Sequence, residues 1–248
     1  MGSLFRAVLA VALACVQTAA APQTVPVPAT GVPPPQVGPA LGAGQPSPPV
    51  VSAPAPGEPA PYAKPQGVYA TIDVSANEAA IRRLGQLIPY PRREAIAAAV
   101  AVAARLSPPA LYALANAVAL GDANMPDAVF WFHVARIRAV YDALRCKDET
   151  ARPVVAEFGK RLNPDVARYQ RQNRQHTLQI AELAIKWDLQ NPRQYDHRWI
   201  NLYGKVARYS AGTDPAELSV PESEWPAILQ RTHEAHLKSV QEFAAVKN

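Results

Sequence analysis

The chain has 248 residues, of which 49% are hydrophobic, and its 25 basic and 20 acidic side chains give a formal net charge of +5. The sequence pI of about 9.3 is a mild basic bias, which suits anionic envelope polymers or lipid headgroups and is no signature of nucleic-acid binding. Of the two cysteines, Cys15 falls in an N-terminal leader. If that leader is removed, Cys146 stands alone, and the fold must be held by packing without a disulfide.

Residues 1–20 have the three-part layout of a secretory signal peptide. Arg6 precedes an apolar run from Ala7 to Val16, and a cluster of small residues ends at Ala21. The apolar run is shorter than the roughly 20 residues that a helix needs to span a bilayer. We therefore expect cleavage after Ala20 and an exported protein, either periplasmic or secreted.

Cys15 allows a second interpretation of the leader. A cysteine that closes an apolar run is where a bacterial lipoprotein is cut and acylated, although the leucine of that pattern, Leu13, is displaced here by one position. Under this alternative the protein is anchored to a membrane through a lipid on Cys15. Without that lipid we expect no membrane contact.

Residues 21–66 are predicted to be a disordered, proline-rich linker. The first 66 residues hold 15 of the 26 prolines, and the linker is nearly free of charge, with Glu58 and Lys64 as exceptions. Such a segment buries too little apolar surface to fold, and as polyproline II it extends by about 3.1 Å per residue. It is expected to act as a tether, and a PxxP docking peptide is the alternative.

Residues 67–248 are predicted to form a single all-α domain of seven or eight helices. Prolines stand near the start of several helical patterns, where the missing N–H costs little, and only Val68–Val74 alternates like a strand. Ser75 with Glu78 is typical of a capping box, and Asn163 and Asp196 are candidate N-caps. The expected helices are 76–87, 91–106, 108–120, 126–146, 152–162, 164–189 with a break near Thr177, 196–209 and 222–245.

The helix 126–146 is expected at the centre of the domain because two of its faces are apolar. The first face comprises Phe130, Val134, Ile137, Tyr141 and Leu144, and the second comprises Ala128, Trp131, Phe132, Ala135 and Ala139. The alanine-rich stretch 95–104 is expected to pack closely against neighbouring helices.

Residues 110–135 read ALYALANAVALGDANMPDAVFWFHVA. The pattern Ala110, Leu114, Ala115, Gly121, then Ala128, Trp131 and Ala135, resembles one Sel1-like repeat, a relative of the tetratricopeptide helical hairpin. The loop after Gly121 is shorter than the family's, and no second copy follows at the expected period. The resemblance implies a helical hairpin in a protein-binding module.

Two segments are candidate binding surfaces. Arginines recur every third residue in one segment, which predicts that they share a helix face, and aromatic and basic side chains gather in the other. The candidate residues are Arg168, Arg171, Arg174, Tyr195, His197 and Trp199. For each segment a structural role is the alternative: a solvated face for the arginines, and a helix start anchored to the core for Trp199.

The sequence offers only fragments of catalytic or metal-binding motifs. His233-Glu234-Ala235-His236 is similar to HExxH, but its histidines stand three apart, so the metalloprotease spacing fails. Nucleophile, phosphate-loop and dinucleotide motifs are missing from the part expected to fold. We expect no catalytic residues, no metal and no cofactor, and we expect Cys146 to be a core residue and not a nucleophile.

These observations favour an exported, non-enzymatic helical module that binds a protein of the cell envelope or extracellular space. The alternative is a hydrolase of an envelope polymer that uses a carboxylate pair, with Glu222 or Glu224 near Trp225 as acid or base. A second alternative is a periplasmic metal-handling protein that uses His233 and His236.

Overall fold

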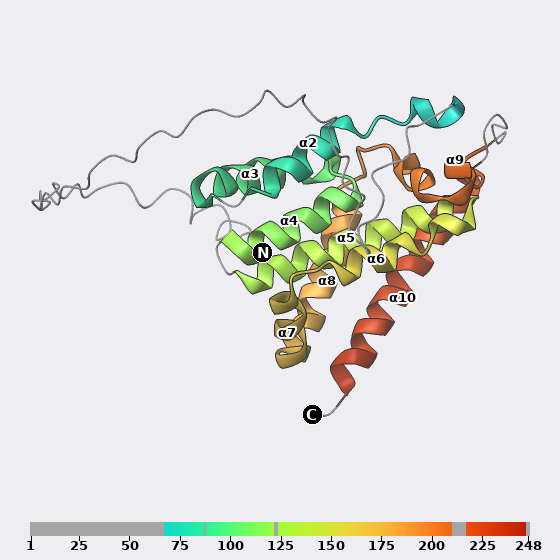
Figure 1. Cartoon of the computed structure of the whole chain (residues 1–248). Helices are drawn as coiled ribbons and strands as arrows, with labels where there is room; N and C mark the ends of the chain where they lie inside the picture. Colours follow the sequence, from blue (N-terminus) through green and yellow to red (C-terminus); the bar gives the residue numbers. More distant parts are fainter. Residues whose placement is uncertain (1–66, 87, 122–123, 210–216, 247–248) are drawn as a thin grey trace, which may run out of the picture. The chain divides into compact units, whose positions relative to one another are not determined.

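Figure 1 shows the computed structural model, which describes residues 67–86, 88–121, 124–209 and 217–246. The predicted leader, its cysteine and the proline-rich linker lie outside the described residues. The described part belongs to one compact unit and is helical. Its only β-type pairing is a single bridge between Cys146 and Ser219. The all-α prediction is confirmed for this part of the chain.

The helices follow the predicted order. The α-helices are α2 (Ser75–Leu84), α3 (Pro89–Ala101), α4 (Pro108–Gly121), α5 (Met125–Arg145), α6 (Val154–Lys160), α7 (Pro164–Gln172), α8 (Arg174–Gln190), α9 (Lys205–Tyr209) and α10 (Trp225–Ala245). Short 3-10 helices lie between or before them: η1 (Gly67–Thr71), η2 (Ala103–Arg105), η3 (Glu149–Ala151), η4 (His197–Tyr203) and η5 (Glu222–Glu224). Within the described ranges no helix is both long enough and apolar enough to cross a membrane.

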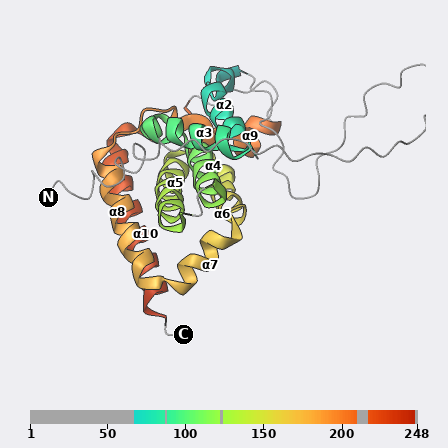
Figure 2. The same cartoon turned by 90° about the vertical axis from the view of Figure 1, so that its left-hand side faces the viewer.

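The long stretch predicted at 164–189 is divided into two helices, and the break lies at Asn173 and not near Thr177. The backbone N–H of Asn173 donates to the Tyr169 carbonyl at 2.9 Å, and its side-chain amide donates to the same carbonyl at 3.0 Å, so Asn173 caps the end of α7. Thr177 is buried inside α8. The break lets α7 and α8 run in different directions (Figure 2).

Two predictions at the start of the domain are wrong. Val68–Val74 does not form a strand, because the 3-10 helix η1 covers most of it. The capping box also does not form: Ser75 is the first helical residue and its backbone N–H donates to Asp73 Oδ1 at 2.9 Å. The Asp73 carboxylate therefore accepts from the Ser75 backbone N–H, the group that the Glu78 side chain would bind in a capping box.

The helix predicted at 196–209 is mostly the 3-10 helix η4, followed by the short α9. Asp196 caps η4 by accepting from the Arg198 N–H at 2.9 Å, so its cap prediction is correct. Gly204 separates the two helices where the Asp148 carboxylate approaches: a Cβ here would lie 1.9 Å from Asp148 Oδ2. That oxygen accepts from the Val206 N–H at 3.1 Å at the start of α9. The carboxylate of Asp148, which is distant in the sequence, thus lies where the predicted helix 196–209 is interrupted.

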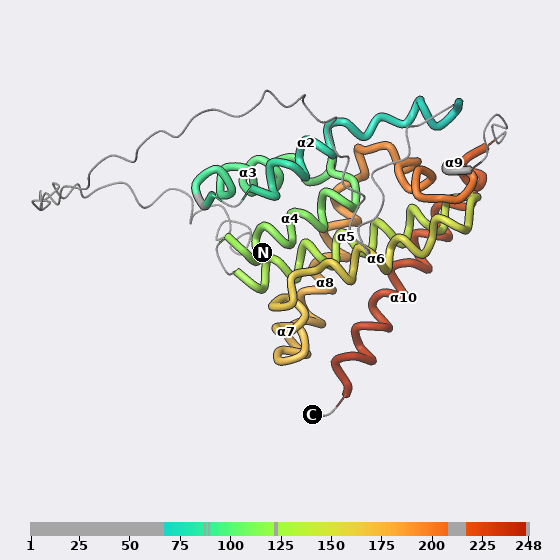
Figure 3. The backbone as a smooth tube through the Cα atoms, in the orientation of Figure 1, coloured from blue at the N-terminus to red at the C-terminus, as the bar shows by residue number. Residues whose placement is uncertain are grey.

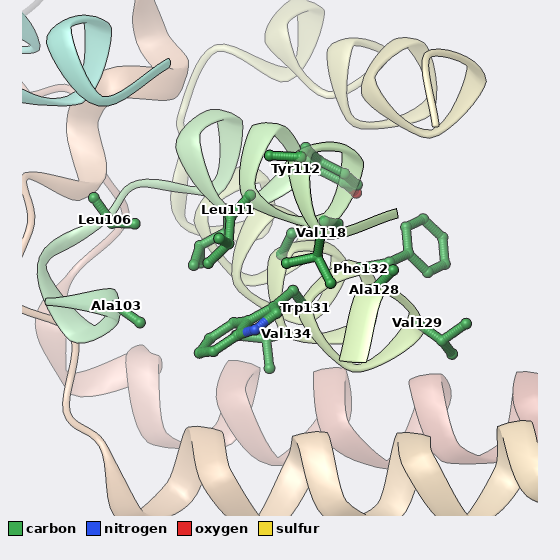
Figure 4. Close-up of a cluster of buried hydrophobic side chains, with 14 of the residues drawn as sticks. Ala103, Leu106, Leu111, Tyr112, Val118, Ala128, Val129, Trp131, Phe132 and Val134 are labelled. Atoms are coloured by element: carbon green, nitrogen blue, oxygen red, sulfur yellow. The ribbon is translucent and has the colours of Figure 1, made fainter. Parts of the chain in front are cut away.

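The helix α5 is central, as predicted. It packs against α4 on one side and against α8 and α10 on another. Figure 4 shows Trp131 and Val134 on the side of α5 that faces α8 and α10, and the Trp131 ring lies 5.4 Å from that of Trp187. The predicted apolar faces are buried, apart from Leu144, which is 37% exposed, and the half-buried Phe130.

The helices α4 and α5 form an antiparallel hairpin whose helices lie side by side (Figure 3). The small residues Ala110, Ala115, Ala128 and Ala135 are all fully buried, so that the helices approach closely. Asn116 ties this hairpin to the next segment: its amide donates to the Arg161 carbonyl, and its oxygen accepts from the Asn163 N–H at 2.8 Å.

Candidate functional site

The six predicted surface residues do not form one surface. Arg168 and Arg171 are exposed on α7, and Arg168 pairs with Asp165. Arg174 starts the next helix, and its guanidinium donates to the Phe243 carbonyl of α10 at 3.0 Å. The prediction that the three arginines share one helix face is wrong because the chain breaks at Asn173.

Tyr195 and Trp199 instead meet at a buried carboxylate. The Tyr195 hydroxyl donates to Asp142 Oδ2 at 2.9 Å, and the Trp199 indole N–H donates to the same oxygen at 2.7 Å. Arg145 Nη2 donates to the other oxygen at 2.5 Å. Burial raises the pKa of Asp142, and the charge of Arg145 opposes this rise. Asp142 therefore anchors the segment 195–199 to α5.

A second buried carboxylate, Asp188 of α8, accepts from two helices and a loop. Arg138 of α5 donates through Nε at 2.8 Å, and Arg193 donates at 2.5 Å. His233 of α10 lies 2.9 Å from Asp188 Oδ2. Burial alone would raise the pKa of Asp188, but the hydrogen bond to His233 and the two arginines hold it below its ordinary value. Both members of the Arg138–Asp188 pair are fully buried.

Aromatic rings connect the two carboxylate clusters. The Arg145 guanidinium carbon lies 4.0 Å from the centre of the Tyr141 ring and 4.5 Å from that of Trp225. The Arg193 guanidinium carbon lies 4.4 Å from the same Tyr141 ring. These are cation–π distances, and they place Arg145 and Arg193 on one shared ring. We call the connected set the α5 network: Arg138, Tyr141, Asp142, Arg145, Asp188, Arg193, Tyr195, Trp199, Trp225 and His233.

The α5 network has more positive than negative charge. Its three arginines face two aspartates, and Arg138 and Arg193 share Asp188. Among the described residues the Nε–H groups of Arg145 and Arg193 are buried and have no hydrogen-bond partner. Buried polar groups are normally paired, because an unpaired donor loses its bonds to water without replacement.

His197, the remaining predicted surface residue, borders the α5 network. Its Nε2 lies 2.9 Å from Ser219 Oγ, and its ring packs edge-on against Trp225 at 4.8 Å. Burial, with the nearby charge of Arg145, lowers the pKa of His197 to about 4. His197 is therefore neutral at neutral pH and adds no charge to the network.

The histidines of α10 bind different partners. His233 contacts Asp188, whereas His236 Nε2 lies 3.0 Å from Nδ1 of His133 on α5. Both α10 histidines are buried. In the described part of the chain no group of three or more histidine, cysteine, aspartate or glutamate side chains is arranged to hold a metal ion.

The other candidate chemical groups are two exposed glutamates and a buried cysteine. Glu222 and Glu224 of η5 are exposed. Cys146 is buried, with Sγ 3.1 Å from Asn201 Oδ1, and burial raises its pKa to about 12. Since the thiolate is the reactive form, this cysteine is a poor nucleophile at neutral pH.

The helix α3 is mixed in polarity: it exposes Arg93 and Glu94 as well as apolar side chains, and it packs Ile96 and Ala99 inward. It lies on the outer side of α4, away from α5 (Figures 1 and 2). It buries Arg92, which donates to the carbonyls of Gln86 and Leu120. Within 95–104, Ala99 and Ala103 are buried in the core, as close packing predicts, whereas the solvent side of α3 is apolar over its last two turns. We call this surface the α3 face: Tyr90, Ala97, Ala98, Val100, Ala101 and Val102, all exposed.

Two members of the α5 network, Tyr195 and Trp199, were among the predicted binding residues, but its centre was missed. The missed residues Arg138, Asp142 and Arg145 were hidden in a helix that we interpreted only by its apolar faces. A signal was present, since Arg138, Tyr141, Asp142 and Arg145 recur at i, i+3, i+4 and i+7 and so form a stripe of their own. Their partner Asp188 carries no signal that a sequence alone reveals.

No family model, curated protein or solved structure matches this chain.

Proposed function

We propose that the chain is an exported, non-enzymatic helical module that binds a protein of the cell envelope through the α3 face. The proposal is supported by the apolar side chains that α3 exposes. A helix on the outside of a protein normally turns its apolar side inward. The inner side of α3 holds Arg92 together with Ile96 and Ala99, and Ala97, Ala98 and Ala101 stay in solvent.

The partner that suits this surface is an amphipathic helix. Small side chains let a second helix approach α3 closely, so that ridges and grooves interlock. Larger exposed groups flank the small ones: Tyr90 is 72% exposed and Val102 is 40% exposed. Tyrosine is enriched at the centres of protein interfaces, and charged residues are depleted there. A Sel1-like hairpin in α4 and α5 is consistent with this proposal, as a support on which α3 rests.

Site-specific photo-crosslinking in the producing cells tests the binding. A photoreactive amino acid at Ala98 or Ala101 is expected to give one discrete adduct, and the same amino acid at exposed Glu182 of α8 is the matched control. Once the partner is identified, Ala101→Lys should weaken its binding at least ten-fold in a purified system, because the lysine is placed in a packed contact. Equal adducts from Ala98 and Glu182, or full affinity of Ala101→Lys, would contradict the proposal.

The export part of the proposal has its own test. The intact mass of the protein recovered from outside the cytoplasm distinguishes cleavage after Ala20 from acylation at Cys15. A mass that corresponds to the whole chain, leader included, would contradict both alternatives.

A further inference from the structure

We infer that the contact between His133 and His236 is an acid-sensitive latch: in mild acid the distal half of α10, residues 237–245, detaches from the domain, while the proximal half, residues 225–235, stays attached. This inference concerns a different part of the molecule from the α3 face and does not depend on the proposed function.

The first reason is the geometry of the two imidazole rings. His236 Nε2 lies 3.0 Å from His133 Nδ1, and both side chains are buried. One proton between these two nitrogens makes a hydrogen bond. The other nitrogen of His133, Nε2, is buried and has no hydrogen-bond partner among the described residues. Any extra proton on the pair therefore leaves either two opposed N–H groups or a buried N–H of His133 without an acceptor, and both arrangements are costly.

The second reason is the charge around the pair. From outside the pair, Arg136 of α5 acts on both rings and His233 of α10 acts on His236, and both of these groups are cationic when charged. The Asp188 carboxylate of α8 already accepts from His233 and two arginines, and the exposed Glu234 accepts from a glutamine of its own helix. Protonation of His236 in the closed contact thus gains no carboxylate partner. Once the contact opens, His236 meets water and accepts a proton readily, so acid favours the open form.

The third reason is that the proximal half of α10 is held by contacts that mild acid does not weaken. His233 Nε2 lies 2.9 Å from Asp188 Oδ2, and a proton on His233 strengthens this contact as an ion pair. The hydrogen bond to His233 and the neighbouring arginines hold the pKa of Asp188 below its ordinary value, so this carboxylate stays ionised in mild acid. At the start of α10 the Trp225 indole N–H donates to the Val220 carbonyl at 3.1 Å, and neither group titrates there.

The distal half gains no comparable contact. Its buried residues are Val240 and Ala244. The carbonyls of Phe243 and Ala244 accept from Arg174 and Gln175 of α8, at 3.0 and 3.4 Å. These contacts do not change with pH in the mildly acidic range, so the loss of the histidine contact is not offset. Detachment exposes the apolar side chains of Val240 and Ala244 to solvent.

Hydrogen exchange of the full chain at about pH 7 and about pH 5, in low concentrations of urea, tests the inference. Opening of the amides in 237–245 should become at least about 20-fold more favourable at the lower pH, because the released His236 regains its ordinary pKa. This opening should be nearly insensitive to urea, since it exposes little surface, whereas exchange at Ile137 in the middle of α5 should accelerate with urea.

Two results would overturn the inference. Equal protection and equal urea dependence at Val240 and Ile137 would show that α10 leaves only when the whole domain unfolds. An opening of 237–245 that does not change with pH would show that the histidine pair is not a latch.

Substitutions at the histidines assign the effect to the pair. His236→Gln keeps a hydrogen-bonding amide beside His133 but does not titrate, so it should reduce the pH dependence of the opening, and His133→Gln combined with it should abolish that dependence. Circular dichroism at neutral pH verifies that each variant folds. His176→Gln, at an exposed histidine of α8, is the matched control and should open as the unaltered chain does. An unchanged acid response in the double variant would place the latch elsewhere.

His233→Gln tests the boundary between the two halves. This substitution removes the group that forms an ion pair with Asp188 in acid, so the acid-released segment should extend into 225–235. If the amides of 225–235 kept their protection at the lower pH in His233→Gln, the assignment of His233 as the residue that holds the proximal half would be wrong.

Discussion

The α3 face and the α5 network depart from ordinary polarity in opposite directions. On α3, apolar side chains face solvent and an arginine is buried; on α5, arginines and aspartates are buried among aromatic rings. Arg92 has a structural reason to be inside, since it donates to the Leu120 carbonyl near the end of α4, where a cation is favoured. The side chains of the α3 face are exposed, Tyr90 at 72% and Val102 at 40%.

The residues of the α5 network and those of the α3 face should differ in what they contribute to the protein. The α5 network joins α5, α8, α10 and the segment 193–199, so its removal should cost stability. The α3 face contributes little to the fold, so its alteration should cost binding and leave stability unchanged. Variants of the two groups of residues should therefore differ in which property they lose.

Asp188→Asn should have the largest effect. Loss of the carboxylate leaves Arg138 charged and fully buried, and such uncompensated charges cost about 3–5 kcal/mol. Urea unfolding of the two proteins measures the difference in free energy of unfolding. Asp165→Asn is the control: its pair with Arg168 is exposed, and we expect a change of about 0–1 kcal/mol. Similar losses in the two variants would show that the α5 network is not a stabilising element.

Tyr195→Phe and Trp199→Phe should each remove one donor from Asp142. A hydrogen bond to a charged group contributes about 1.5–3 kcal/mol, which sets the expected loss for Tyr195→Phe. Because both donors serve the same oxygen, the double variant should not lose the sum of the two single effects. Strict additivity in a double-mutant cycle would mean that the two side chains do not share Asp142.

The histidines between α5 and α10 should make the fold sensitive to acid. Burial, with the charges of Arg136 and His233, lowers the pKa of His236 to about 4, and burial lowers the pKa of His133 well below 6.5. Below about pH 6.5 the unfolded chain therefore binds more protons than the folded chain does. The contribution of these neutral histidines to the free energy of unfolding is present above about pH 6.5 and falls as the pH drops toward 4. For His236 the loss between pH 6.5 and 5 is about 2 kcal/mol.

Unfolding free energies measured across this pH range test the assignment. His236→Gln should flatten the pH dependence, whereas His176→Gln, at an exposed histidine of α8, should leave it unchanged. An unaltered slope in His236→Gln would assign the acid sensitivity to other groups.

Sequence reasoning predicted the helices well because their signals are local. Pro108 and Pro164 start α4 and α7, and Asn163 caps α7 as expected from its own side chain. The segment 196–209 was harder, because its helix type depends on Asp148, a contact from far along the chain. Helical propensity carries no information about such a contact.

The candidate sites were predictable to different degrees for the same reason. The stripe on α5 can be recognised from its spacing, but its meaning depends on Asp188, which lies 50 residues beyond Arg138. The α3 face was misjudged because a run of alanine and valine looks the same whether it is packed or exposed. Which side of α3 meets α4 is decided by Arg92 and Ala99, through contacts that no local pattern contains.

The smallest effect on stability is expected at the α3 face, and it is also the sharpest test of the comparison. Ala98→Lys and Ala101→Lys place a long charged side chain in solvent on a helix, where lysine is nearly as favourable as alanine, so the free energy of unfolding should change by less than about 0.5 kcal/mol. Ala99→Lys, one position away and buried against α4, should instead lose several kcal/mol. If Ala98→Lys and Ala101→Lys lost as much stability as Ala99→Lys, the α3 face would be part of the protein's own packing. Unchanged stability together with lost partner binding would assign these apolar side chains to recognition, because no other physical role in the fold remains for them.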